Sequence, residues 1–203
     1  GHSVLVLESG GSDRHPRHLV PLNFAGTSTD TRYAESLATE PADGAGPDHW
    51  IRGRVVGGST TINGLQWNRG PARVYDDWER AGNPGWGWPQ FRRAFMAMED
   101  HVLGPGPDRG VDGPMPVTPA LPHDPVSNRL LQAFGAGGVA AVDDVNADDS
   151  DRVGYVAFTT RRGRRVSAAT AFLRPALRHP GVSLRTGVTA ERMLFDGTRA
   201  TGG

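Results

Sequence analysis

Residues 53–64 read GRVVGGSTTING, and this stretch decides how the rest of the chain is interpreted. It places two adjacent glycines, Gly57 and Gly58, before hydroxyl side chains and an Asn-Gly step. Glycines let a backbone approach another group closely, and amide N–H groups and hydroxyls can donate to a phosphate without any lysine. The stretch therefore suits an anion-binding turn. On these residues alone, an ordinary turn capped by Ser and Thr side chains is favoured.

A second feature lies near the start of the chain. Residues 4–7 read VLVL, the pattern of a buried parallel strand, and Glu8 and the pair Gly10-Gly11 follow. Dinucleotide-binding folds place their ribose-binding acid at the carboxyl end of such a strand, about 20 residues after a glycine-rich loop. That loop would precede residue 1. Without further support, such an acid is more often a solvated charge at the end of a strand.

Composition excludes several kinds of chemistry. All 22 basic side chains are arginine and balance 22 acidic ones, and the sequence contains no lysine and no cysteine. A Walker A loop, a Schiff-base lysine, a thiol nucleophile, a zinc ribbon and disulfides are therefore excluded. The basic run at 161–165 is predicted to be a solvated hairpin tip rather than a nucleic-acid contact, because the net charge is zero and no aromatic residues interleave.

The periodicity predicts a chain of mixed helices and strands. A strand is expected over 3–8, mostly irregular structure over 9–50 and a helix over 72–80. A further helix begins at Pro89, with Phe91, Phe95 and Met98 on its core side. Later elements are a helix capped by Ser127, a strand near 155–160, a helix capped by Ser167, a strand near 182–184 and a hairpin over 191–201. Because the chain begins inside a strand and stops inside a hairpin, we expect it to be a fragment.

The histidines give no sign of a metal or catalytic centre. They are scattered without the spacing of metal ligands, and each is predicted to be a surface or capping residue: His2, His15, His18, His49, His101, His123 and His179. The sequence therefore predicts no metal site and no catalytic residue within this chain.

At residues 53–76 the sequence GRVVGGSTTINGLQWNRGPARVYD resembles the first signature of the glucose–methanol–choline (GMC) flavoprotein oxidoreductases. Further blocks agree with that family in their order along the chain: VLVLESGG at 4–11, YDDW at 75–78, GNPGWGW at 82–88, RRVSAATAFL at 164–173 and LRTGVTAERMLFDGTRATG at 184–202. The resemblance covers nearly the whole chain. It also favours a packing or cofactor-adjacent role for four of the five tryptophans over a carbohydrate-binding surface.

The resemblance implies an α/β fold of mixed α+β character. Part of a dinucleotide-binding FAD domain would be interleaved with part of a substrate domain built on an antiparallel sheet. On this basis residues 1–103 are expected to belong to the FAD-binding domain and residues 104–180 to the substrate domain. Residues 181–203 would return to the FAD-binding domain.

The resemblance also implies the residues that hold FAD. Glu8 would bind the adenosine ribose, and Ala190, where relatives usually have Val, would contact adenine through its backbone. Two further groups are implied, along the pyrophosphate and ribityl chain and beside the flavin respectively: Val55, Gly57, Gly58, Ser59 and Thr60, then Asn63, Gly64, Leu65 and Gln66. Ile62 stands where some members carry a histidine bonded to the flavin, so non-covalent FAD is expected.

The implied reaction is oxidation of an alcohol, a choline-type compound or a sugar. A histidine base takes the hydroxyl proton while the carbinol hydride moves to flavin N5. That base, its partner and the upstream phosphate loop have no counterpart in this chain, so the isolated chain is expected to be inactive and to aggregate or stay partly unfolded.

We expect a small-molecule alcohol as substrate and an unknown electron acceptor. No nucleic-acid partner, no membrane span and a cytoplasmic location are expected. The alternative is a non-catalytic remnant or subunit that packs with a partner.

Overall fold

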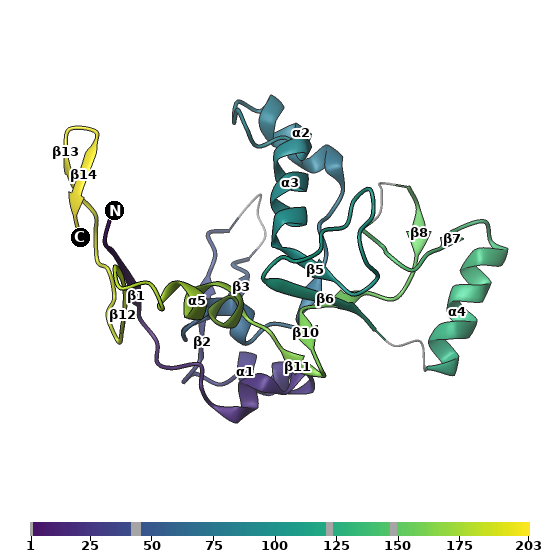
Figure 1. The fold of residues 1–203 in the computed structure, drawn as a ribbon, viewed down its shortest axis with the longest axis horizontal. Helices are drawn as coiled ribbons and strands as arrows, with labels where there is room; N and C mark the ends of the chain where they lie inside the picture. Colours follow the sequence, from purple (N-terminus) through teal and green to yellow (C-terminus); the bar gives the residue numbers. More distant parts are fainter. Residues whose placement is uncertain (1, 42–45, 121–123, 147–149) are drawn as a thin grey trace. The chain divides into compact units, whose positions relative to one another are not determined.

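The computed structural model describes residues 2–41, 46–120, 124–146 and 150–203 (Figure 1). It divides the chain into two compact units. Unit 1 comprises residues 1–64 and 164–203, and unit 2 comprises residues 65–163. The chain therefore leaves unit 1 directly after the glycine-rich stretch.

The described residues of unit 1 form three strand pairs. Strand β1 (Val4–Glu8) pairs in parallel with β12 (Val182–Thr186). Strands β2 (Ala34–Ala38) and β3 (His49–Gly53) are antiparallel, as are β13 (Leu194–Asp196) and β14 (Arg199–Gly202). The remaining elements of the unit are short: η1 (Pro16–Leu19), η2 (Pro21–Asn23), α1 (Phe24–Ser28), η3 (Gly58–Thr61), β11 (Arg164–Arg165), η4 (Ala169–Leu173) and α5 (Arg174–Ala176).

Unit 2 is organised around a four-stranded sheet with the strand order β4-β9-β6-β5. Its strands are β4 (Gln66–Trp67), β5 (Glu99–His101), β6 (Met115–Pro119) and β9 (Ala157–Phe158). Strand β9 is antiparallel to β4 and to β6, whereas β5 and β6 are parallel. The other elements are α2 (Ala72–Arg80), α3 (Trp88–Met98), α4 (Pro125–Ala136), β7 (Ala140–Ala141), β8 (Arg152–Val153) and β10 (Thr160–Arg161).

Aromatic side chains join α2 to α3, which lie side by side in Figure 1. The ring of Phe91, on α3, lies 4.4 Å from that of Tyr75 and 6.0 Å from that of Trp78, both on α2, measured between centroids. The Tyr75 hydroxyl donates to the carbonyl of Arg69, and its ring is buried. The amide of Trp88, at the start of α3, donates to Oδ1 of Asp76 at 2.9 Å. These contacts explain why the tryptophan-rich blocks fold locally as a helix pair.

Several predicted elements are confirmed. Helix α2 spans the predicted residues 72–80, and Pro89 lies in the first turn of α3. The helix predicted after Ser167 is present as η4; its N-cap is Ala168, and the Ser167 hydroxyl accepts a hydrogen bond from the amide of Thr170 at 3.4 Å. The hairpin turns at Gly197, whose φ of +57° requires the left-handed backbone that glycine adopts readily.

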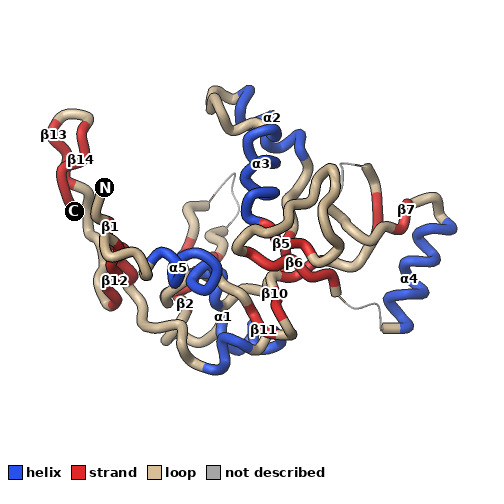
Figure 2. Tube along the Cα trace, in the orientation of Figure 1, coloured by secondary structure: helices blue, strands red, loops and turns tan. Residues whose placement is uncertain are grey.

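Residues 9–50, expected to be mostly irregular, contain η1, η2, α1, β2 and the start of β3 between irregular stretches (helices blue and strands red in Figure 2). Other expectations are wrong. Strand β1 is parallel as predicted but not buried. Among the described strands it pairs with β12 alone, so Leu5 is 51% exposed. Helix α4 is capped by Asp124 rather than Ser127. The Asp124 carboxylate accepts hydrogen bonds from the Ser127 hydroxyl and from the amides of Ser127 and Val126, and these bonds hold its pKa below the ordinary value.

The units change at residues 64/65 and 163/164. The domain boundaries at 103/104 and 180/181, which the family resemblance implies, stay a prediction. The Pro/Gly-rich segment that begins at residue 104 packs inside unit 2. There, the Gly110 amide donates to Oε2 of Glu99 at 3.0 Å, and the Gly110 carbonyl accepts from the amide of His101 at 3.1 Å. In the described part of the chain, no helix has the length and apolar character needed to cross a membrane.

Candidate functional site

The glycine-rich stretch forms a tight turn between β3 and η3 in unit 1. Gly57 and Gly58 both have a left-handed backbone, with φ of +90° and +57°. A Cβ on Gly57 would lie 2.5 Å from Oγ1 of Thr61 and 3.0 Å from Cβ of Ala169. A Cβ on Gly58 would meet nothing within 4 Å. Packing therefore requires glycine at 57, and the turn is open on the side of Gly58.

Threonine hydroxyls hold the shape of this turn. The Thr60 hydroxyl donates to the carbonyl of Gly57 at 2.5 Å and accepts from the amide of Ala168 at 2.9 Å. The Thr61 hydroxyl donates to the carbonyl of Val56 at 2.8 Å. Because both hydroxyl protons are used inside unit 1, these two side chains build the turn rather than offering donors to an anion.

Two more internal hydrogen bonds close the turn. The Gly58 amide donates to the carbonyl of Val55 at 2.7 Å, and the Gly53 amide donates to Oγ of Ser59 at 3.1 Å. The glycine at 53 is required by the close approach of the chain to itself, since a Cβ there would overlap the backbone of Gly58. An anion at this turn would therefore be met by amides other than that of Gly58.

The end of β1 lies against the same turn. Oε1 of Glu8 accepts a hydrogen bond from the amide of Gly10 at 2.7 Å, which fixes the carboxylate at the carboxyl end of the strand. Gly11 forms a parallel bridge with Val55, and its carbonyl accepts from the amide of Val56 at 2.9 Å. The structure thus brings together the two sequence features, the acid at the strand end and the glycine-rich turn.

The other predicted cofactor residues divide between the units. Asn63, Gly64 and Ala190 belong to unit 1, whereas Leu65 and Gln66 begin unit 2. Ala190 is exposed and lies two residues beyond Val188, whose amide donates to the carbonyl of Glu8 at 3.1 Å.

Leu65 and Gln66 are fixed by the sheet of unit 2. Leu65 has a φ of +62°, is 3% exposed, and accepts a hydrogen bond from the Thr159 amide at 2.9 Å. Gln66 pairs with Phe158 across β4 and β9. A positive φ at a buried leucine indicates that packing overrides the ordinary backbone preference at this position.

Arg165 is a residue that the sequence reasoning missed. It was expected in a solvated hairpin tip, yet it is 4% exposed. Its guanidinium donates to the carbonyls of His18 and Thr60 at 3.0 and 3.1 Å and to Oδ1 of Asn63 at 2.8 Å. Alternation along β11, which leaves Arg164 exposed and buries Arg165, is the signal that could have found it.

His18 is likewise buried rather than a surface residue. It is 3% exposed, its Nδ1 lies 2.9 Å from the carbonyl oxygen of Asp13, and its ring packs edge-on against Tyr33 at 4.5 Å between centroids. The 3₁₀ helix η1 carries it into the interior of unit 1, next to the Arg165 side chain.

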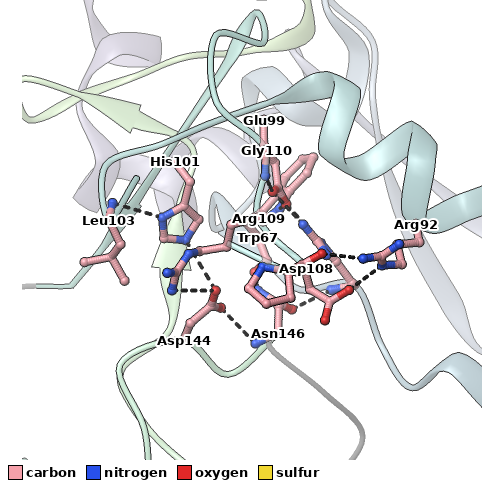
Figure 3. A network of polar contacts seen from close by, with 12 residues as sticks. Trp67, Arg92, Glu99, His101, Leu103, Asp108, Arg109, Gly110, Asp144 and Asn146 are labelled. Atoms are coloured by element: carbon pink, nitrogen blue, oxygen red, sulfur yellow. Dashed lines mark hydrogen bonds and ion pairs between the residues drawn. The ribbon is translucent and has the colours of Figure 1, made fainter. Parts of the chain in front are cut away.

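Unit 2 contains a separate cluster of buried polar groups, shown in Figure 3. Glu99 is 1% exposed and Arg69 3%. The guanidinium of Arg69 donates from Nε to Oε1 of Glu99 at 2.9 Å and from Nη2 to Oε2 at 2.5 Å. Oε1 also accepts from the indole N–H of Trp67 at 2.6 Å, and Oε2 from the amide of Gly110. The two carboxylate oxygens thus accept four hydrogen bonds, which is the condition for a stable buried ion pair.

His101 extends this cluster and corrects the expectation of a surface histidine at a helix end. It is 4% exposed because it lies in β5, beside β6, rather than at the end of α3. Its Nδ1 accepts from the amide of Leu103 at 3.2 Å. Its Nε2 lies 3.9 Å from Oδ2 of Asp144, and Nη1 of Arg109 lies 3.6 Å from the same oxygen (Figure 3).

The environment of His101 predicts that acid destabilises unit 2. Burial lowers the pKa of His101 below its ordinary value of 6.5; Asp144 and Glu99 oppose this shift, while Arg109 and Arg69 add to it. His101 therefore binds a proton more readily in the unfolded chain than in the folded one. The free energy of unfolding is highest above pH 6.5 and decreases as the pH falls below this value. Thermal unfolding at pH 7.5 and pH 5.5 measures the effect.

The difference in melting temperature between pH 7.5 and pH 5.5 is expected to be smaller in His101→Gln than in the unsubstituted protein. His49→Gln is the matched control, because His49 is exposed and its replacement is expected to leave the pH dependence unchanged. An identical pH dependence in His101→Gln and the unsubstituted protein would contradict the prediction.

A cavity of about 590 Å³ also lies in unit 2, and residues such as Asn68, Trp88, Asp108 and Asn146 line it. None of its lining residues belongs to the predicted cofactor set. Within the part of the chain that the structure describes, no group of three or more His, Asp or Glu side chains is arranged to hold a metal ion.

Comparison with known proteins identifies the family of this fold and site. The family model described as GMC oxidoreductase matches residues 30–202, and the chain therefore belongs to that family. Mitochondrial choline dehydrogenase of Mus musculus is 33% identical over 210 residues, and oxygen-dependent choline dehydrogenase of Sinorhizobium fredii is 36% identical over 203. Each comparison covers 99% of this chain. The chain spans 35% and 37% of the length of these relatives.

Solved structures confirm the predicted mixed α/β fold. Pyridoxine 4-oxidase from Mesorbium loti is similar over 98% of this chain and 40% of its own, with a TM-score of 0.87 and 29% identity. An FAD-dependent oxidoreductase from Chaetomium thermophilum is similar over 98% of this chain and 36% of its own, with a TM-score of 0.78 and 26% identity. The chain thus has the fold of part of a GMC flavoenzyme.

Proposed function

We propose that this chain forms part of the FAD-binding portion of an enzyme that oxidises the CH–OH group of a small alcohol. The observation that carries the proposal is the bridge between Gly11 and Val55, which brings the Glu8 strand end against the glycine-rich turn. Membership of the GMC oxidoreductase family supports it, as does the resemblance to choline dehydrogenases. We also propose a cytoplasmic location and no nucleic-acid partner, both of which are expectations from the sequence alone.

The described residues fit a bound dinucleotide in two respects. The turn is open at Gly58, where a Cβ would meet nothing within 4 Å. The Glu8 carboxylate is held through Oε1, and in the described structure its Oε2 accepts no hydrogen bond, so this oxygen is available to a ribose hydroxyl. Both are features that a cofactor of this shape and polarity requires.

The residues that would hold FAD follow from this fit and from the resemblance. Glu8 would accept hydrogen bonds from the adenosine ribose, and Ala190 would meet adenine through its backbone. The turn from Val55 to Thr60 would pass along the pyrophosphate and ribityl chain, and residues 63–66 would run beside the flavin. We assign residues 1–103 and 181–203 to the FAD-binding portion and 104–180 to the substrate portion.

When bound, FAD would supply the acceptor for the hydride of the carbinol carbon. The chain's own residues bind and orient: the Glu8 carboxylate fixes one end, and the rigid turn around Gly57 fixes the backbone donors. No residue of this chain is assigned as the base that removes the hydroxyl proton. We therefore expect the 203-residue chain to show no turnover.

We predict that the flavin is bound without a covalent link. Ile62 is 2% exposed and packs with Val55 and Ala34 in the core of unit 1, so a hydrocarbon occupies the position of the flavin-bonded histidine. Acid precipitation of the flavin-loaded protein is expected to leave the yellow colour in the supernatant. An Ile62→His variant provides the comparison, and colour retained in the pellet of the unsubstituted protein would contradict the prediction.

The function is tested in the gene product that contains residues 1–203. The protein is incubated with FAD and desalted, and retained flavin is measured by absorbance. Choline, pyridoxine and a simple primary alcohol are then added separately without oxygen, and bleaching of the flavin absorption reports hydride transfer. Bleaching by one alcohol supports the proposal. Failure to retain FAD, or retained FAD that no alcohol reduces, would contradict it.

A further inference from the structure

Arg165 carries a buried positive charge in the part of unit 1 that forms the glycine-rich turn. The side chain is 4% exposed, and its three hydrogen-bond acceptors are neutral oxygens, on His18, Thr60 and Asn63. Burial lowers the pKa of Arg165 to about 10, so the guanidinium is still charged at neutral pH. A buried charge of this kind ordinarily has a partner of opposite sign.

That partner is absent from the described residues, among which no carboxylate oxygen lies within 4.0 Å of the Arg165 nitrogens. Arg174, in the same unit, shows the ordinary arrangement, because its Nη2 lies 2.7 Å from Oδ2 of Asp13. Arg174 thus has a carboxylate partner, whereas Arg165 has none among the described residues. This contrast indicates that an anion other than a described side chain balances the charge of Arg165.

The acceptors of Arg165 show where such an anion would act. Two of the three belong to the glycine-rich turn: the Thr60 carbonyl at 3.1 Å and the Asn63 side-chain oxygen at 2.8 Å. A guanidinium that donates to a carbonyl polarises the attached amide, so the N–H groups that follow become stronger donors. Because Oδ1 of Asn63 faces Arg165, the amide nitrogen of that side chain is directed away from the guanidinium.

We propose that Arg165 is a positioning residue whose buried charge is balanced by the pyrophosphate of the dinucleotide when the cofactor binds the turn. The inference rests on the proposed function and deepens it. It predicts that Arg165 distinguishes flavins by charge: the residue favours ligands that carry the pyrophosphate over an uncharged flavin. A residue that only braces the turn would affect both kinds of ligand equally.

The test compares three ligands: FAD, riboflavin, which lacks the pyrophosphate, and ADP, which lacks the flavin. Dissociation constants are measured for the gene product that contains residues 1–203 and for its Arg165→Gln variant. The substitution is expected to raise the dissociation constants of FAD and ADP by about ten- to a hundredfold. It is expected to raise that of riboflavin by no more than about threefold, because the uncharged flavin lacks the balancing anion.

Arg164→Gln is the matched control, since Arg164 is the preceding residue of β11 and is exposed, so its charge is screened by solvent. It is expected to change none of the three constants by more than about twofold. If circular dichroism shows that Arg165→Gln does not fold, the same dissociation constants are measured for Arg165→Lys. Lysine keeps the charge and loses the planar fork, so the ratio of FAD to riboflavin affinity is expected to stay within about threefold of the original.

Equal weakening of FAD and riboflavin by Arg165→Gln would overturn the inference and leave the proposed function standing. A tenfold loss of the affinity ratio in Arg165→Lys would overturn it as well. If the unsubstituted protein binds neither FAD nor riboflavin, the proposed function itself fails, and the inference fails with it.

Discussion

Glu99→Gln is expected to lower the free energy of unfolding by about 3–5 kcal/mol. Glu99 and Arg69 are both almost fully buried, and the carboxylate balances the charge of the guanidinium. The amide has nearly the same size but no charge, so it leaves a buried cation without a counter-ion. It also replaces one carboxylate oxygen by an NH₂ group, so that either the Trp67 indole or the Gly110 amide then lacks an acceptor. Denaturant-induced unfolding of both proteins measures the difference.

A matched control comes from the surface of the same unit. Asp77 and Arg80 form an ion pair on α2 in which the side chains are 57% and 71% exposed. Asp77→Asn is expected to change the free energy of unfolding by less than about 1 kcal/mol, because solvent screens the pair. The double substitution Arg69→Met with Glu99→Leu is expected to recover much of the lost stability. A Glu99→Gln variant as stable as Asp77→Asn would show that the ion pair is not buried as described.

Elements with local signals could be predicted from the sequence. The glycine pair at 57–58, helix 72–80 and the turn at Gly197 depend on residues within a few positions of one another. A positive φ demands glycine locally, and a helix shows its period within two turns. For such elements the structure confirms what the residues indicate.

Partnerships between distant residues could not be predicted. Glu99 follows a helix and precedes Asp100, which reads as solvated charge, and its partner Arg69 lies 30 residues away. Arg165 and Asn63 are 102 residues apart. Such burial is decided when separate segments pack, and no pattern within one segment records it. Histidines 18 and 101 were misplaced for the same reason.

The candidate site lies between these two cases. The residues alone favoured an ordinary capped turn and a solvated charge at a strand end, and the assignment of both features to one cofactor site came from the family resemblance. The bridge from Gly11 to Val55 gives that combination a physical basis, because it joins the strand end to the turn through backbone hydrogen bonds. A side chain that disturbs this joint is therefore expected to disturb both features at once.

Gly10→Ala tests that joint and is expected to destabilise unit 1 by about 3 kcal/mol. A Cβ on Gly10 would overlap the carbonyl group of Arg54, closer than real Cβ atoms approach any atom. The nearest atoms that this Cβ would meet, in Arg54 and Val55, belong to the backbone, so no flexible side chain can move aside. The bridge from Gly11 to Val55 must then open, which also moves the Glu8 carboxylate away from the turn.

The adjacent residue supplies the control for this prediction. A Cβ on Gly11 would meet nothing within 4 Å, and Gly11 does not have a positive φ, so Gly11→Ala is expected to change stability by less than about 1 kcal/mol. Thermal unfolding and flavin retention are measured for both variants. Gly10→Ala is expected to lose both together, because one backbone contact holds the strand end and the turn. If Gly10→Ala keeps its stability and its flavin as Gly11→Ala does, the close approach of residues 10 and 54 does not organise the site.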